Sequence, residues 1–390
     1  MIVAGSGLAA GRSLENAALD ASLRALSRSG QDHADLAVVF VTGDAYASAA
    51  RILHIVRRVT GARALIGCSG AGVLTDHGEV EGASAVAVLT IQSDRLAMTP
   101  FLLEDQEKAS TEAGSELAAR VGRTVAEGGC LVVLPDAAGL DPRALLDGLR
   151  DSLGFVPVMG GVSAGTPLFE LFDTDPVQGG IAGVALSGAE PIVGVAQGCM
   201  PIGEPYVITR AEGNAIQEIG SQPAVEILKE AVLSLEGAEE RIRRAGVFAG
   251  LAMDPAKSPL ERGDFLVRNL VGLDQSSGAI AVAEPVRVGQ TIQFQIRDAQ
   301  SSQEDLHATL EDIAKRLAGR QPAFGCYFNC AGRGQGLFGT PDHDIIMIAE
   351  LLGEFPLAGF FGNGEFAPIG RQNFFHNYTG ALVVFPQKPS

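Results

Sequence analysis

A cysteine and an arginine flank a glycine-rich turn near the C-terminal end of the sequence. The strand-like run Phe324 to Cys330 ends in this turn, which continues through Arg333 and Gly334. A thiol at a strand end can be exposed, and a neighbouring arginine lowers its pKa, which makes the thiolate a nucleophile. The backbone N–H groups around Gly334, together with Arg333, could instead bind a carboxylate or a phosphate. The alternative is that Cys330 is a small buried side chain, because no base lies next to it in the sequence.

A second cluster of polar side chains supplies the groups that a small zwitterion needs: a cation for its carboxylate, and an acid and an amide for its ammonium group. These residues are Asn363, Glu365, Arg371 and His376. The two-residue period of the closing strand places His376 and Asn377 on opposite faces, so only one of them can face a ligand. The alternative is a surface ion pair between Glu365 and Arg371, with His376 bonded within the sheet. The candidate ligand-binding residues are Cys330, Arg333, Gly334, Asn363, Glu365, Arg371, His376 and Asn377.

Spacing excludes several other kinds of site. Cys326 and Cys330 lie on the same face of a strand about 13 Å apart, which is too far for a disulfide. The segment Gly334 to Gly339 has the form GxGxxG, but Thr340 and Pro341 delay the helix start that a dinucleotide site requires. His, Cys, Asp and Glu residues do not cluster at metal-ligand spacing. We therefore predict neither a cofactor nor a metal ion.

The elements that carry these residues contain an internal repeat. An apolar strand ending at an aspartate, a helix, and a second strand ending in a glycine turn occur twice in the same order, over about residues 36–91 and 130–187. The two glycine turns read ALIGCSGAG and VPVMGGVSAG, and Pro356 to Ala367 has the same design. Asp44 and Asp136 end equivalent strands, and we expect each to cap the helix that follows.

The pattern as a whole predicts an α+β fold of mixed, largely antiparallel β-sheets covered by helices, with an internal duplication in the N-terminal half. Consecutive strand-like runs in the second half can be joined only by hairpins. A helix from Ser13 to Gly30, capped by Ser13, precedes the repeats. We divide the chain into an N-terminal helix (1–30), a domain that contains the duplication (31–222) and a second domain (223–390).

Composition narrows the class of protein. The chain has 390 residues, of which 46% are hydrophobic and 19% are charged, so it folds. Its 46 acidic and 29 basic residues give a net charge of −17, which argues against binding to nucleic acid. The five cysteines are unlike a secreted disulfide framework, so we expect a cytoplasmic protein. The sequence contains no export signal and no apolar run of about 20 residues, so we expect no membrane insertion.

The glycine turns and the C-terminal motifs together resemble the FIST domains, in their paired N-terminal and C-terminal forms. The motifs are ALIGCSGAGVL (64–74), GCMPIG (198–203), TRAEGN (209–214), GCYFNCAGRG (325–334), AGFFGNGEFAP (358–368) and FHNYT (375–379). The resemblance assigns 31–222 to the N-terminal form and 223–390 to the C-terminal form. It implies an intracellular sensory module that binds small ligands such as amino acids. Output domains often accompany FIST domains, but we recognise none here and expect a separate signalling protein as partner.

Three functions remain open at this point. The first is a sensory protein without a catalytic step, whose ligand lies between the turn Cys330 to Gly334 and the turn Asn363 to Glu365. The second is a thiol-dependent transferase or hydrolase with Cys330 as nucleophile and His376 as base. The third is a protein-interaction scaffold. Because no catalytic constellation is complete, the sequence favours binding over catalysis.

Overall fold

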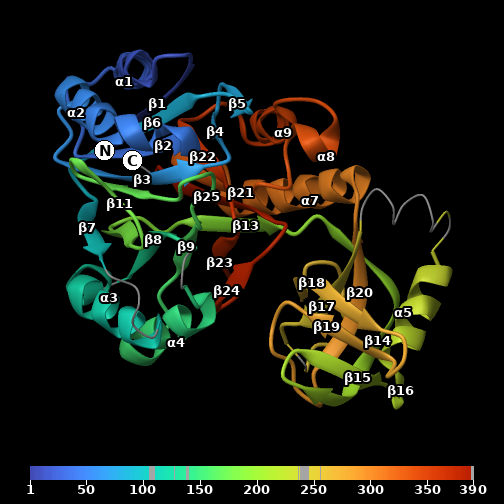
Figure 1. The fold of residues 1–390 in the computed structure, drawn as a ribbon. Coiled ribbons are helices and arrows are strands. Elements are labelled where there is room, and N and C mark those ends of the chain that lie inside the picture. Colours follow the sequence, from blue (N-terminus) through green and yellow to red (C-terminus); the bar gives the residue numbers. More distant parts are fainter. Residues whose placement is uncertain are drawn as a thin grey trace. The chain divides into compact units, whose positions relative to one another are not determined.

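The computed structural model describes residues 1–104, 110–126, 128–137, 140–235, 237, 246–254 and 256–387. The chain divides into two compact units that are not consecutive in sequence (Figure 1). The first unit contains Met1–Val195, His307–Phe375 and Thr379–Ser390, and the second contains Ala196–Leu306 and His376–Tyr378. The second unit is therefore an insertion in the chain of the first.

Three segments of the chain have the same order of elements, and we call them repeats 1, 2 and 3. Repeat 1 contains β1 (Ile2–Ala10), α1 (Leu14–Ser29), β2 (Leu36–Thr42), η1 (Gly43–Ser48), α2 (Ala49–Thr60), β3 (Ala64–Gly70), β4 (Gly72–Thr75), β5 (Gly78–Glu81) and β6 (Ala85–Ser93). Repeat 2 contains β7 (Ala97–Leu103), α3 (Ser110–Val125), β8 (Gly129–Pro135), α4 (Pro142–Leu153), β9 (Val158–Gly161), β10 (Glu170–Phe172), β11 (Asp175–Val177) and β12 (Ile181–Ser187). Repeat 3 contains β13 (Ile192–Ala196), α7 (Ala299–Leu317), β21 (Pro322–Cys330), α8 (Gln335–Phe338), α9 (His343–Leu352), β22 (Leu357–Gly362), β23 (Glu365–Ile369), β24 (Gln372–His376) and β25 (Gly380–Pro386).

The strands of the repeats form three six-stranded sheets with equivalent topology. Their orders are β1-β6-β2-β3-β10-β11, β7-β12-β8-β9-β23-β24 and β13-β25-β21-β22-β4-β5. The central pairs β2·β3, β8·β9 and β21·β22 are parallel, and the strands on either side of each pair are antiparallel to it. This arrangement confirms the predicted fold of mixed, largely antiparallel sheets with an internal duplication. The structure adds a third copy, which the sequence shows only through its glycine turn.

One hairpin of each repeat pairs with the sheet of another repeat. The hairpin β4-β5 of repeat 1 pairs with β22 of repeat 3, β10-β11 of repeat 2 pairs with β3 of repeat 1, and β23-β24 of repeat 3 pairs with β9 of repeat 2. The exchange is cyclic, so the three repeats interlock and none of the sheets is complete without its neighbour.

The three sheets face a common apolar core, and helices cover outer faces. Alternate residues of β2 divide between two clusters, with Val38 and Phe40 in the central one and Val39 and Val41 in the outer one. The central cluster draws on all three sheets, and the ring centroid of Phe40 lies 4.9 Å from that of Phe360 in the third sheet. Helices α1 and α2 pack on the outer face of the first sheet, and α3 and α4 on that of the second (Figure 1).

One of the three predicted helix caps is confirmed, and two are wrong. The Ser13 side chain accepts a hydrogen bond from Asn16 N (3.3 Å) and caps α1, as predicted, although residues 1–30 contain the strand β1 as well as this helix. The expectation that Asp136 caps the next helix is wrong, because Asp141 caps α4. Asp44 does not cap α2 either: its carboxylate accepts hydrogen bonds from the hydroxyls of Thr42 and Ser84.

The second unit is a small antiparallel β-barrel. Its elements are β14 (Cys199–Glu212), β15 (Ala215–Ile219), β16 (Gln222–Pro223), α5 (Ala224–Leu233), β17 (Val247–Ala252), β18 (Phe265–Asp274), β19 (Ala279–Val282) and β20 (Thr291–Arg297). Because β14 pairs with both β20 and β15, the order β14-β20-β17-β18-β19-β15 closes on itself around its own apolar core. Among the described helices of the chain, none is both long and apolar enough to cross a membrane.

Candidate functional site

Each repeat of the first unit ends its second core strand in a glycine turn. A Cβ atom at the first glycine of each turn would overlap a carbonyl oxygen of the parallel partner strand. The glycines and the residues opposite them are Gly67 with Val39, Gly160 with Val133, and Gly359 with Tyr327. Only glycine fits where two backbones approach so closely. These three glycines are therefore structurally equivalent positions.

Backbone hydrogen bonds join the three turns into a ring. They run from Ala71 N to Phe361 O (2.9 Å), from Asn363 N to Val162 O (3.0 Å) and from Ala164 N to Ser69 O (3.0 Å). In every turn the donor lies two residues after the acceptor, so the ring has approximate threefold symmetry. The ends of the core strands of all three repeats thus meet at one place in the first unit.

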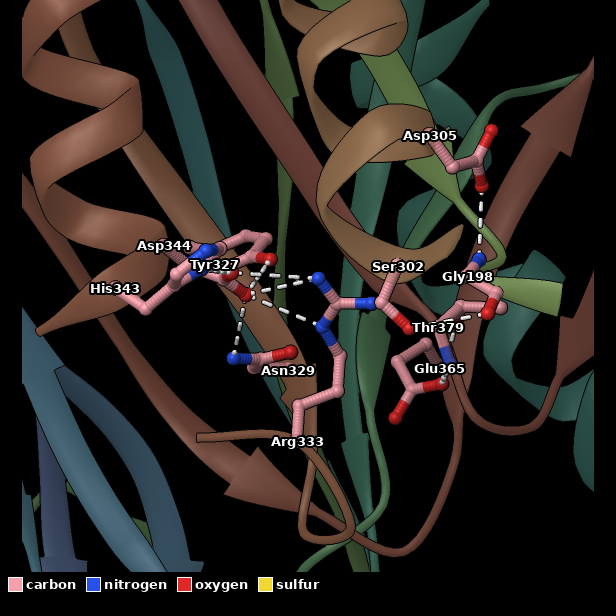
Figure 2. A network of polar contacts seen from close by, with 10 residues as sticks. All are labelled: Gly198, Ser302, Asp305, Tyr327, Asn329, Arg333, His343, Asp344, Glu365 and Thr379. Atoms are coloured by element: carbon pink, nitrogen blue, oxygen red, sulfur yellow. Dashed lines mark hydrogen bonds and ion pairs between the residues drawn. The ribbon is translucent and has the colours of Figure 1, made fainter. Parts of the chain in front are cut away.

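Three of the predicted site residues come together where repeat 3 reaches this ring. Cys330 N donates to Thr379 O (2.9 Å), and the Thr379 hydroxyl donates to Glu365 Oε2 (2.6 Å), as Figure 2 shows for the second contact. Glu365 is fully buried, whereas Cys330 is half-buried and Asn363 is exposed. Asn363 Nδ2 donates to Ser163 O (2.8 Å) of repeat 2. A buried carboxylate, an amide and a thiol therefore share this strand end.

Arg333 lies in the adjoining loop, but its guanidinium is bound within the chain. It forms an ion pair with Asp344 (3.1 Å), and both side chains are buried (Figure 2). Tyr327 Oη and Asn329 Nδ2 also donate to Asp344 Oδ2, at 2.7 and 3.3 Å. Burial opposes the charge on this carboxylate, but Arg333 and the hydrogen bonds outweigh it and lower the pKa of Asp344. Burial, followed by the charge of Asp344, raises the pKa of Tyr327.

Gly334 also faces a carboxylate of the chain itself. Its φ is +77°, and a Cβ atom there would overlap the Glu81 side chain. Gln335 N donates to Glu81 Oε1 (2.8 Å). The backbone turn around Gly334 thus binds a carboxylate, as its sequence predicts for a ligand, but the carboxylate belongs to β5.

The remaining predicted residues lie elsewhere. Arg371 is exposed in the turn between β23 and β24, with its guanidinium 5.4 Å from the ring centroid of Phe155. His376 is buried at the end of β24, and Asn377 is half-buried after it. Both belong to the second compact unit, whereas the other six predicted residues belong to the first.

Two family models match the chain in tandem. The FIST N domain covers residues 35–222 and the FIST C domain covers residues 224–368. The chain belongs to the FIST family. FIST domains are sensory domains in signal transduction, so this FIST protein shares a family with sensors.

Relatives of this FIST protein occur in mycobacteria. An uncharacterized protein of Mycobacterium tuberculosis is 35% identical over 388 residues, which cover 98% of this chain and 99% of the relative. Another, from Mycobacterium bovis, is 37% identical over 344 residues, or 86% of each chain. The crystal structure of a cyanuric acid hydrolase from A. caulinodans matches 48% of this chain and 70% of its own, with 10% identity and a TM-score of 0.27. So low a TM-score supports no inference about function.

The FIST protein holds a further buried carboxylate that sequence analysis did not select. Glu170 begins β10, is fully buried, and accepts a hydrogen bond from Gly180 N at its Oε2 (3.3 Å). Burial, followed by the charge of Asp136, raises the pKa of Glu170 to about 9. An alignment of all three repeats would have found it, because Glu170 in β10 and Glu365 in β23 occupy equivalent register positions.

Proposed function

We propose that this FIST protein is a cytoplasmic sensor that binds a small amino-acid-like ligand at the strand ends of repeat 3. Glu365 is the observation that carries this proposal: it is a fully buried carboxylate at the point where β21 and β22 end and β25 begins. A buried carboxylate is retained only where hydrogen bonds or an opposite charge offset its desolvation. Thr379 N and the Thr379 hydroxyl donate hydrogen bonds to Glu365, and the ammonium group of an amino acid is a cation that a carboxylate binds.

The neighbouring residues fit the rest of such a ligand. The exposed Asn363 amide offers both a donor and acceptors, and the half-buried Cys330 thiol borders the same strand end. Arg333 and Gly334 act by shaping the loop between Cys330 and α8, because each already faces a carboxylate of the chain. Roles for Arg371, His376 and Asn377 in binding remain predictions.

A thermal-shift screen tests the proposal. The purified protein is heated with each of the twenty amino acids and with simple dicarboxylates, because a ligand that binds only the folded state raises Tm. The Glu365→Gln variant keeps the shape and removes the charge, and the exposed Glu116→Gln variant is the matched control. We expect a Tm rise that Glu116→Gln retains and Glu365→Gln loses. A panel without any rise, or a rise that survives in Glu365→Gln, would overturn the proposal.

A further inference from the structure

A short segment of repeat 3 lies against the edge strand β5 of the third sheet. We call this segment, residues 334–342 with α8, the strap. Two carboxylates join the strap to β5 in opposite directions. Gln335 N donates to Glu81 Oε1 (2.8 Å), and Glu79 N donates to Asp342 Oδ1 (2.6 Å). The strap thus satisfies a backbone N–H group of a strand at the edge of its sheet.

The fit between the strap and β5 leaves no room for side chains at two glycines. A Cβ atom at Gly78 would lie 2.9 Å from Asp342 Oδ1, and one at Gly334 would overlap the Glu81 carboxylate. An aspartate directly before a helix usually caps it. Asp342 precedes α9 but makes no side-chain cap hydrogen bond, because its carboxylate binds β5 instead. The helix end has therefore given its capping group to the strap contact.

The Glu79 side chain lies among other acids at this contact. Its carboxyl group is buried, and the charges of Asp344, Glu81 and Asp342 act on it, in that order of strength. Both oxygens of the carboxyl group are buried, and among the described residues neither has a hydrogen-bond partner. Nothing in this part of the structure therefore offsets the desolvation that an ionised Glu79 would suffer.

The other polar groups at this contact are already bound to Asp344. Arg333 forms an ion pair with this carboxylate (3.1 Å), and His343 Nδ1 lies 2.9 Å from its Oδ1 (Figure 2). Burial, followed by the charge of Asp344 and more weakly by that of Glu79, raises the pKa of Tyr327 in β21, so this phenol stays neutral. An ionised Glu79 would add a negative charge where the arginine is already paired.

We propose that the strap is a proton-sensitive lid, which lies on β5 while Glu79 is protonated and detaches when Glu79 ionises. Detachment lets water reach the Glu79 carboxylate and moves the charge of Asp342 away from it. It also uncovers the edge of β5. The inference is independent of the proposed ligand, because it invokes neither Glu365 nor Asn363.

Opening of the strap is coupled to the release of a proton. In the closed form, burial and then the neighbouring charges raise the pKa of Glu79 from 4.5 to about 8, and exposure to water returns it toward 4.5. Between these pH values the open form binds fewer protons, so opening becomes about tenfold more favourable for each pH unit. The closed strap is most stable below this range, and the effect levels off above it.

Hydrogen exchange of the full chain, read by peptide mass spectrometry from pH 5.5 to pH 7, tests the inference. Exchange rates are divided by those of an unstructured chain at the same pH, which gives the protection of each peptide. We expect the protection of the strap to fall by about tenfold per pH unit in the wild type. Glu79→Gln mimics the protonated acid and should keep its protection at every pH. The exposed Glu116→Gln variant is the matched control and should behave as the wild type.

Peptides from β21 separate opening of the strap from unfolding of the whole unit. The strap should exchange at least tenfold faster than β21, because it opens while the core stays folded. Glu79→Gln keeps Arg333, His343 and Tyr327, so the difference between the two proteins belongs to Glu79. Each of four results would overturn the inference: a strap unprotected at pH 5.5, a strap that exchanges no faster than β21, protection that is constant with pH, or an equal pH dependence in Glu79→Gln.

Discussion

At the scale of single residues, the buried ion pair between Arg333 and Asp344 should tolerate little change. The exposed fraction is 0% for the Arg333 side chain and 1% for the Asp344 side chain. Arg333→Ala leaves the Asp344 charge buried without its cation, so we expect a loss of roughly 3–5 kcal/mol in the free energy of unfolding. Urea denaturation of the variant and the wild type measures this loss in the free energy of unfolding. The exposed pair of Arg150 with Asp147 is the control, and Arg150→Ala should lose less than about 1 kcal/mol. Equal losses would contradict this account of Arg333.

Glu79 should make stability depend on pH. Burial, followed by the charges of Asp344, Glu81 and Asp342, raises the pKa of Glu79 from 4.5 to about 8. Between these pH values the unfolded carboxyl is ionised while the folded one keeps its proton, so this residue's contribution to stability falls as pH rises, by at most about 1.4 kcal/mol per pH unit. The glutamine side chain of the Glu79→Gln variant has no group that titrates in this range.

The stability of Glu79→Gln relative to the wild type should therefore increase from pH 5 to pH 8. Urea denaturation at each pH measures the difference. Parallel pH profiles for the two proteins would show that Glu79 titrates normally in the folded state.

The cysteines should differ sharply in reactivity. Cys68, Cys130, Cys199 and Cys326 are buried, and burial raises the pKa of Cys130 and Cys326 to about 12. Cys330 is half-buried. Iodoacetamide should therefore alkylate Cys330 first in the native protein, as peptide mass spectrometry can show.

The pH dependence of this alkylation also tests the alternative of a thiol enzyme. An apparent pKa well below the usual value of about 8.5 would support a catalytic thiol. An ordinary pKa would count against it, and alkylation of the other cysteines at the same rate would contradict the burial pattern.

At the scale of elements, the three glycine turns depend on close approach between parallel strands. Alanine at Gly67, Gly160 or Gly359 places a Cβ atom against a backbone carbonyl. We expect each substitution to destabilise the protein by about 1–3 kcal/mol, since the backbone must shift. Gly336 in α8 has open space around its Cβ position, so Gly336→Ala should be neutral or stabilising. Thermal denaturation compares the four variants. A loss in Gly336→Ala as large as in the other three would contradict the role of close strand approach, and unequal losses among the three turn variants would contradict the equivalence of the turns.

At the scale of the whole molecule, the two compact units have separate apolar cores. Leu65 belongs to a core of the first unit and Ile216 to that of the barrel, and both are fully buried. We expect differential scanning calorimetry to resolve two transitions. Leu65→Ala should lower the midpoint temperature of one transition and Ile216→Ala that of the other. Each substitution should reduce the free energy of unfolding of its own unit by about 2–5 kcal/mol. A single transition that both variants lower would show that the units unfold together.

The sequence by itself determined the features that depend on neighbouring residues. Ser13 caps α1 because the two groups that interact lie three positions apart, and the glycine turns can be recognised from their local sequence. Apolar runs and turn residues were enough to predict the mixed sheets and the duplication. The third repeat escaped a full prediction because the barrel separates β13 from α7 in the chain.

Only the tertiary structure decided which groups meet. Arg333 was predicted to bind a ligand carboxylate, but a sequence does not show that Asp344 and Glu81 reach this loop first. The equivalence of Glu170 and Glu365 became visible only from the cyclic exchange of hairpins, which places both residues at the same register position. Such contacts are set by strand pairing between distant segments, and local propensity carries no information about that pairing.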